Sequence, residues 1–85
     1  MVDKKLTLRL VAPGVKQDPN FPQLADMVIL PCTTGQLGVL PGRLPCTMVL
    51  GTGHVRVIAD GEEYQAAVQG GIATVGGDVV TVLSV

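Results

Sequence analysis

The chain of 85 residues contains few of the side chains on which most active sites and nucleic-acid surfaces depend. It has no tryptophan, one histidine, two cysteines and only two aromatic residues, Phe21 and Tyr64. Its six basic residues are scattered, and the formal net charge is -1. Nucleic-acid surfaces combine a basic patch with aromatic rings that stack on bases. The composition therefore does not support nucleic-acid binding.

Long hydrophobic runs are also missing. No apolar run approaches the roughly 20 residues of a membrane-spanning helix, so we expect no direct membrane insertion. The apolar segment behind Lys4 and Lys5 is short and is interrupted by Arg9, unlike the core of a signal peptide. Without an export signal, we expect Cys32 and Cys46 to be reduced thiols, because disulfides persist mainly in oxidising compartments.

The chain is rich in small aliphatic residues. Apolar residues make up 47% and charged residues 15%, whereas charged residues average about 25% in soluble domains. The length allows one domain, spanning residues 1–85. Because the domain is small and unusually apolar, we expect a partner to cover part of its surface.

The apolar residues follow the period of β-strands. Residues 6–12 and 54–59 alternate, and the second segment places Val55, Val57 and Ala59 inside with His54 and Arg56 outside. Asp60-Gly61 predicts a hairpin turn. Residues 27–30 form a continuous apolar run, expected to be a strand buried on both faces. Further strands are expected over 47–50, 63–68, 72–75 and 79–85, and no window has the period of a helix.

Glycine and proline separate these strands. Residues 33–45 read TTGQLGVLPGRLP and contain Gly35, Gly38 and Gly42. Because glycine adopts backbone conformations that other residues avoid, we expect an irregular, closely packed path here. Gly51-Thr52-Gly53 and Gly70-Gly71 are expected to interrupt the chain again. Residues 16–23 are expected to be a loop, held down by Phe21. Short strands with glycine turns at this spacing predict an all-β sandwich or barrel.

No cluster of residues fits a catalytic or cofactor site. A metal site needs about four suitable ligands, and two separated cysteines with one histidine do not supply them. Cys32 or Cys46 with His54 could form a Cys–His pair, but a third orienting group is missing. The acidic residues Glu62 and Glu63 fit a solvated turn, and the glycines match no nucleotide loop. Biotinyl and lipoyl domains carry their cofactor on a lysine at the tip of a tight hairpin, and no lysine of this sequence is expected at such a tip. We expect no cofactor, no metal and no enzymatic activity.

The order of the motifs resembles the epsilon subunit of rotary F-type ATP synthases, in its N-terminal β-sandwich domain. The family pattern G-E-L-G-[IV]-L-P-G-H-A-P is similar to GQLGVLPGRLP at residues 35–45, and the later V-S-G-G and V-T-V-L are similar to VQGG and VTVL. The resemblance covers residues 6–83 and implies a flattened β-sandwich or barrel of about ten short strands. The structural turn residues that it implies are Gly38, Pro41, Gly42, Pro45, Gly70 and Gly71.

The resemblance also implies a role and two partners. It implies a non-catalytic subunit of the central stalk that links the gamma subunit to the membrane c-ring and couples ion flow to ATP synthesis. The residues implied on the gamma side are Arg43, Met48 and Ala12, and those on the c-ring side are Gln36, Thr34 and Gly35. Arg43 stands where the family usually has histidine, and Gln36 where it usually has glutamate. The implied location is peripheral, on the cytoplasmic face of the bacterial plasma membrane.

Family members usually continue into a C-terminal helical hairpin that restrains ATP hydrolysis in many bacteria. Residues 1–85 do not include this hairpin, so we expect from them neither that inhibition nor ATP binding. The alternative from another functional class is a free-standing β-sandwich adaptor or scaffold domain that binds a different protein. An enzyme built on the two cysteines and His54 is the third hypothesis.

Overall fold

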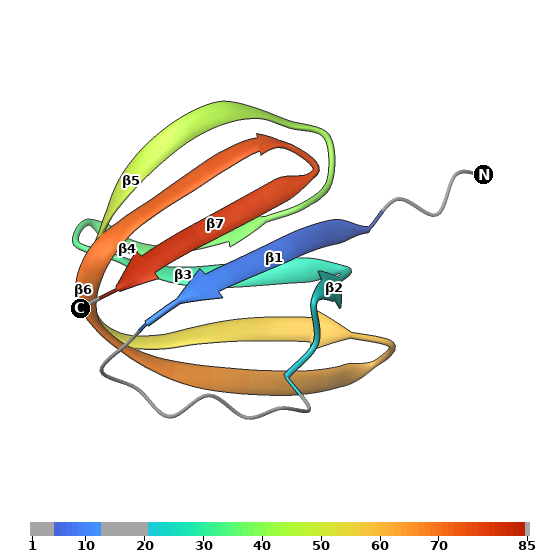
Figure 1. The fold of residues 1–85 in the computed structure, drawn as a ribbon, viewed down its shortest axis with the longest axis horizontal. Coiled ribbons are helices and arrows are strands. Elements are labelled where there is room, and N and C mark those ends of the chain that lie inside the picture. The colour runs from blue at the N-terminus through green and yellow to red at the C-terminus, as the bar shows by residue number, and fades with distance from the viewer. Residues whose placement is uncertain (1–4, 13–20, 85) are drawn as a thin grey trace.

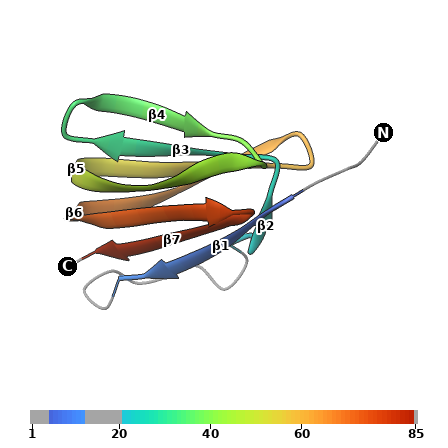
Figure 2. The same cartoon turned by 90° about the horizontal axis from the view of Figure 1, so that it is seen from above.

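The computed structural model describes residues 5–12 and 21–84, and at residues 43 and 44 it describes the backbone alone. The described residues form seven strands and no helix. They are β1 (Leu6–Val11), β2 (Leu24–Ala25), β3 (Met27–Cys32), β4 (Gly35–Val39), β5 (Arg43–Ala59), β6 (Glu62–Gly77) and β7 (Val79–Ser84). They form one seven-stranded sheet in the order β2-β1-β7-β6-β5-β3-β4, so β4 and β2 are its two edges (Figures 1 and 2).

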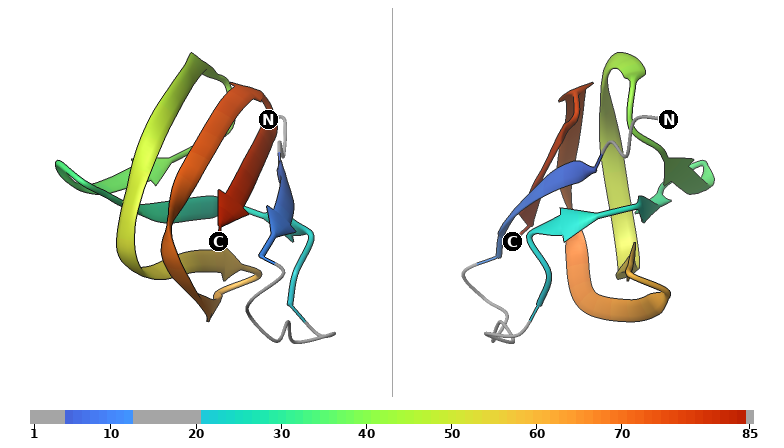
Figure 3. Two further views of the ribbon diagram at one scale, coloured as in Figure 1. Left: turned by 60° about the vertical axis from the view of Figure 1, so that its left-hand side comes forward. Right: turned by 90° about the vertical axis from the view of Figure 1, so that its right-hand side faces the viewer.

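The sheet curls because β5 and β6 are long and bent. β5 has 17 residues and β6 has 16, and they pair from Arg43 and Gly77 at one end to Ala59 and Glu62 at the other. The part of β6 that begins at Gly71 pairs with β7, whereas β3 pairs mainly with the far end of β5. This one hairpin therefore contributes to both layers of a flattened sandwich (Figure 3).

The all-β sandwich class is confirmed. About ten short strands were expected, and the described residues form seven, two of them long. The interruptions expected at Gly51-Thr52-Gly53 and Gly70-Gly71 are bends inside continuous strands. Gly70 and Gly71 have φ angles of 80° and 132°, values that glycine adopts without strain. The backbone thus changes direction while β6 stays paired with β5.

Residues 33–45 form a strand between two turns, so the expected irregular path is wrong. A two-residue turn leads from β3 into β4, and Pro41 and Gly42 turn the chain from β4 into β5. Gly42 has a φ angle of 84°, and its N–H donates to Oδ1 of Asp78 at 3.0 Å. Glycine is required at this turn because its φ angle is positive.

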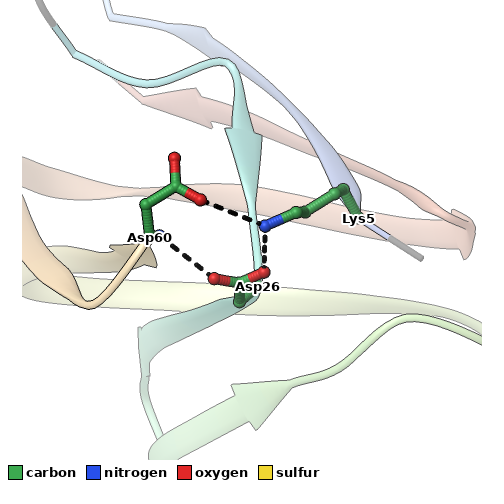
Figure 4. Close-up of polar contacts among 3 residues, drawn as sticks. All are labelled: Lys5, Asp26 and Asp60. Atoms are coloured by element: carbon green, nitrogen blue, oxygen red, sulfur yellow. Dashed lines mark hydrogen bonds and ion pairs between the residues drawn. The ribbon is translucent and has the colours of Figure 1, made fainter. Parts of the chain in front are cut away.

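The turn between β5 and β6 is the hairpin that Asp60-Gly61 predicts. Asp60 and Gly61 have φ angles of 52° and 80°, and both angles must be positive in a type I′ turn. The Asp60 N–H donates to Oδ2 of Asp26 at 3.1 Å, and Lys5 Nζ donates to Oδ1 of the same carboxylate (Figure 4). Lys5 Nζ also lies 3.4 Å from Oδ1 of Asp60. These contacts join the hairpin tip to the start of β1 and to the turn before β3.

The side chains of β5 alternate between core and surface, as predicted. Val55 and Val57 are fully buried and Ala59 is buried, whereas His54 is exposed and Arg56 is half-buried. The same alternation in the other strands supplies one core cluster. Its members are Leu6, Leu8, Ala25, Val28, Leu30, Val39, Leu50, Val55, Val57, Val68, Ala73, Val75, Val80 and Val82.

β3 was expected to be buried on both faces, but only one of its faces is fully buried. Val28 and Leu30 are fully buried, but Met27 and Ile29 are only half-buried, so burial on both faces was wrongly predicted. The continuous apolar run concealed the alternation of an antiparallel strand that packs one face on the core.

Phe21 packs against the core next to Tyr64. The two rings meet edge to face, with centroids 6.3 Å apart and an interplanar angle of 76°. Such a pair stabilises the contact beyond the area it buries. Phe21 therefore holds down the described end of the predicted loop, whose residues 16–20 lie outside the described part of the chain.

Candidate functional site

The three residues predicted for the c-ring side lie together at the tip of the β3–β4 hairpin. Thr34, Gly35 and Gln36 are all exposed. Gly35 pairs with Cys32 across the hairpin and has a φ angle of 125°. The tip is therefore an accessible turn at one edge of the sheet.

The three residues predicted for the gamma side do not lie on one exposed surface. Ala12 is 2% exposed, and Met48 is half-buried against the core. The Sδ atom of Met48 lies 3.6 Å from Sγ of Cys32. Arg43 begins β5 opposite Gly77, and its side chain lies outside the described part of the structure.

The predicted turn residues serve different purposes. Gly38 lies inside β4, and a Cβ atom there would be 2.5 Å from Cε of Met27, so glycine allows this close packing. Pro45 is exposed in β5, within the pairing irregularity between Arg43 and Cys46. A Cβ atom on Gly71 would be 2.0 Å from the carbonyl oxygen of Leu83. Gly71 is thus a packing requirement of the sheet, because the atoms it meets belong to the backbone, whereas at Gly38 the contact is with the flexible end of the Met27 side chain.

An exposed row of apolar side chains, which the sequence pattern did not predict, crosses four strands. Val49 of β5 pairs with Ile72 of β6, Ile72 with Leu83 of β7, and Leu83 with Val11 of β1. Their exposed fractions are 61%, 47%, 49% and 49%. Since neighbouring strands are about 4.8 Å apart, the row is roughly 14 Å long. We name these four residues the apolar row. Contiguous exposed apolar side chains mark contact surfaces.

A polar row lies beside the apolar row on the same face. Thr47 pairs with Thr74, Thr74 with Thr81, and Thr81 with Arg9. Each residue is two positions from a member of the apolar row, so the side chains point the same way. The apolar row thus has a polar border with one positive charge.

A groove opens where the ladder between β3 and β5 is interrupted. Ile29 pairs with Arg56 and Cys32 with Leu50, so two residues of β3 face five residues of β5 between these pairs. Pro31 stands at this interruption, and it cannot donate a ladder hydrogen bond. The groove has a volume of about 470 Å³. Its lining includes Gln36, Thr52, His54, Arg56, Gln65 and Cys32.

The charged groups beside the groove pair with each other. Arg56 Nη2 donates to Oε1 of Glu63, and Gln65 Nε2 donates to Oε2 at 2.9 Å. The hydrogen bond from Arg56, followed by that from Gln65, lowers the pKa of Glu63 below 4.5. The same pair raises the pKa of Arg56. The charge of Arg56 is therefore matched within the chain.

The groove does not have the geometry of a cysteine nucleophile. Cys32 and His54 both line it, but no hydrogen bond between them is found among the described residues. Burial raises the pKa of the Cys32 thiol, with a smaller contribution from Cys46. A nucleophilic cysteine needs a lowered pKa, because the thiolate is the reactive form. The structure thus gives no support to a Cys–His pair.

The described residues hold neither a metal-binding cluster nor a membrane-spanning helix. Residues 5–12 and 21–84 contain no group of three or more His, Cys, Asp or Glu side chains placed to hold a metal ion. The same part of the chain contains no helix that is long and apolar enough to span a membrane. The candidate surfaces are the apolar row and the hairpin tip with its groove.

Residues 5–85 match the family model of the ATP synthase, Delta/Epsilon chain, beta-sandwich domain. The ATP synthase epsilon chain of Synechococcus sp. (strain WH7803) is 50% identical over 78 residues, covering 92% of this chain and 55% of that one. The ATP synthase epsilon chain of Prochlorococcus marinus (strain MIT 9211) is 47% identical over 79 residues, covering 92% and 56%. The chain spans about half the length of these relatives.

A similar fold occurs in the cryo-EM structure of the Euglena gracilis mitochondrial ATP synthase, OSCP/F1/c-ring in rotational state 1. The TM-score is 0.79 and the sequence identity is 23%, and the match covers 94% of this chain and 50% of that one. This likeness supports the β-sandwich fold.

Proposed function

This chain belongs to the ATP synthase delta/epsilon β-sandwich family, and on that basis we propose that it is a non-catalytic part of the central stalk of a rotary ATP synthase. In this role it links the gamma subunit to the membrane c-ring and helps to couple ion flow to ATP synthesis. The observation that carries the proposal is the family match over residues 5–85. The two exposed surfaces of the sheet give it a physical basis.

The apolar row is the surface best suited to the gamma subunit. The predicted residues Ala12 and Met48 are buried or half-buried, but their sequence neighbours Val11 and Val49 are exposed in the row. Burying apolar side chains removes them from water and favours association. We therefore assign the gamma contact to the apolar row, with Arg43 at the start of β5 retained as a predicted contact.

The hairpin tip is the surface best suited to the c-ring. Thr34, Gly35 and Gln36 are exposed and lie at the β3–β4 edge, whereas the apolar row crosses β1, β7, β6 and β5 (Figure 2). A subunit that links two partners needs two separate surfaces, and this arrangement supplies them. The location that follows is peripheral, on the cytoplasmic face of the plasma membrane, and residues 1–85 are proposed to bind no ATP.

Co-purification tests the proposal against the adaptor alternative. The tagged chain is expected to recover the gamma subunit and the assembled ATPase under mild conditions. Recovery of neither, together with capture of a different defined partner by the correctly folded chain, would contradict the stalk function and favour a free-standing adaptor domain.

A further inference from the structure

We propose that Arg9 determines specificity in the gamma contact, by pairing with a carboxylate that the gamma subunit presents beside the apolar row. This inference rests on the proposed function, because the apolar row is assigned to the gamma subunit there. It adds one charged contact, at a defined position on β1, to a surface that is otherwise apolar or uncharged. The gamma residue that it requires is an Asp or a Glu.

Arg9 lies on the outward face of the neighbouring strands β5, β6, β7 and β1 (Figure 1). It is exposed and ends the polar row, where Thr81 is its ladder partner. Lys5 and Arg56 both have carboxylate partners in the described part of the chain. Arg9 forms no ion pair with any described residue. Its guanidinium can therefore bind a group on another chain.

The face around Arg9 has no negative side chain. It is formed by β1, β7, β6 from Gly71 onward and the part of β5 that pairs with it. Its described outward positions are Thr7, Arg9, Val11, Pro45, Thr47, Val49, Ile72, Thr74, Gly76, Val79, Thr81 and Leu83. Asp78 lies in the turn at the end of this face, and its carboxylate accepts a hydrogen bond from the Gly42 N–H. Arg9 is thus the one charged side chain among these described positions.

A partner that binds the apolar row also covers Arg9. Arg9 is two residues from Val11 on β1, a spacing of roughly 7 Å along the strand. A stable protein–protein interface buries about 800 Å² on each partner, a patch roughly 28 Å across. Centred on the apolar row, such a patch extends roughly 14 Å to either side. The polar row, with Arg9 at its end, therefore lies within it.

Covering Arg9 removes its guanidinium from water. A cation that is buried without a counter-charge destabilises a complex. The neighbouring Thr7 and Thr81 hydroxyls are neutral, so they cannot supply the counter-charge. A carboxylate on the partner can, and it accepts two parallel N–H bonds from a guanidinium. An uncharged surface that contains one arginine therefore selects a partner with one matching acidic residue.

The binding kinetics of the gamma subunit test this pairing. Arg9→Gln removes the charge, whereas Arg9→Lys keeps the charge and loses the planar guanidinium. We expect Arg9→Gln to weaken binding roughly tenfold and to make the association rate less dependent on salt. Arg9→Lys should keep the salt dependence of the parent and lose part of its affinity. Ala67→Glu is the control and should bind as the parent does, because it changes the net charge equally on the exposed part of β6 before Gly71.

Cross-linking identifies the carboxylate on the gamma subunit. A carbodiimide activates a carboxylate, and a nearby lysine amine then forms an amide with it, while the carbodiimide takes up water to become a urea. Arginine does not react in this way. Arg9→Lys should therefore give a cross-link to an Asp or Glu of gamma that the parent complex lacks, detected by peptide mass spectrometry. Ala67→Lys is the matched control and should add no cross-link to gamma.

The possible outcomes separate the pairing from the proposed function. If Arg9→Gln binds gamma as tightly as the parent at low and high salt, the pairing is overturned and the stalk function stands. A complex of Arg9→Lys that gives no new amide with gamma would also overturn the pairing. A correctly folded parent chain that does not bind gamma would overturn both.

Discussion

The Ser84 hydroxyl donates a hydrogen bond to the carbonyl oxygen of Gly70 at 2.9 Å, at the bend of β6. The same hydroxyl oxygen accepts a hydrogen bond from the N–H of Gln69 at 3.2 Å. Ser84 is a buried polar side chain, and it bonds two backbone groups of β6 that lie just before Gly71, where the pairing of β6 with β7 begins. One side chain of β7 thus stabilises the curvature of its neighbouring strand.

Ser84→Ala is therefore expected to destabilise the fold by about 1–2 kcal/mol, because it leaves a partly buried carbonyl and an N–H without that partner. Urea unfolding followed by circular dichroism measures the change. Thr74→Ala, on the exposed face, is the control and is expected to stay within about 0.5 kcal/mol of the parent. Equal midpoints for the two variants would show that the bend does not need the hydroxyl.

Gly71→Ala is expected to be among the most damaging single substitutions. Its Cβ atom would lie 2.0 Å from the Leu83 carbonyl oxygen, and the φ angle is 132°. The backbone strain alone costs about 1–3 kcal/mol, and the clash adds to it. Gly76→Ala, on the same strand, has open space and no positive φ angle, so it should keep the melting temperature. A Gly71→Ala protein that melts with the parent would contradict the close approach of β6 and β7.

The contribution of Asp26 to stability depends on pH. Hydrogen bonds, first from Lys5 and then from the Asp60 N–H, lower the pKa of Asp26 below 3.8 in the folded chain. Its contribution is therefore present above pH 3.8 and is lost as the pH falls through the lower folded pKa. The pKa of Lys5 is raised above 10.5, chiefly by the hydrogen bond to Asp26, so its contribution is present below pH 10.5 and is lost as the pH rises through the higher folded pKa.

Asp26→Asn tests this linkage in urea unfolding at neutral pH and at about pH 2. The parent should be the more stable protein at neutral pH, and the difference should shrink on acidification. A difference that is the same at both values would mean that the Asp26 charge is not what the fold depends on. Lys5→Met, made in the parent chain, removes the ion pair with Asp26 but leaves the hydrogen bond from the Asp60 N–H to Asp26. Comparing it with Asp26→Asn separates the two contributions.

Ile72→Glu is expected to weaken binding of the gamma subunit by roughly tenfold or more, because it places a charge in the middle of the apolar row. The side chain is 47% exposed, so the isolated chain should remain folded. Thr74→Glu lies two positions along β6 and faces the same way, so it controls for charge on this face. Surface plasmon resonance with purified gamma gives both affinities; equal effects would move the contact away from the apolar row.

The sequence predicted the parts of the fold that depend on short-range chemistry. Asp60-Gly61 specifies a turn through two adjacent backbone angles, and the alternation of Val55 and Val57 specifies which face is buried. Gly70-Gly71 was misread as the end of a strand, since glycine pairs serve both turns and bends. Only the partner strand distinguishes these uses: β5 stays paired on both sides of the bend.

The candidate surfaces were less accessible to sequence reasoning. The apolar row brings together positions 11, 49, 72 and 83, and recognising it requires the register of four strands. The groove depends on a ladder interruption opposite Pro31, and single residues gave no signal for it. Thr34, Gly35 and Gln36 were predicted as a group, because they are contiguous in the turn that carries the family motif.

The shared strand β5 has a mechanical consequence. Val49 in the apolar row and His54 in the groove are five residues apart on one strand, a span of roughly 17 Å. A mechanical force applied at one of these residues is transmitted to the other through the covalent backbone of β5. β6 pairs with β5 on both sides of this span and braces it along one edge. Sliding the two strands of this hairpin past each other therefore requires many ladder hydrogen bonds to break together.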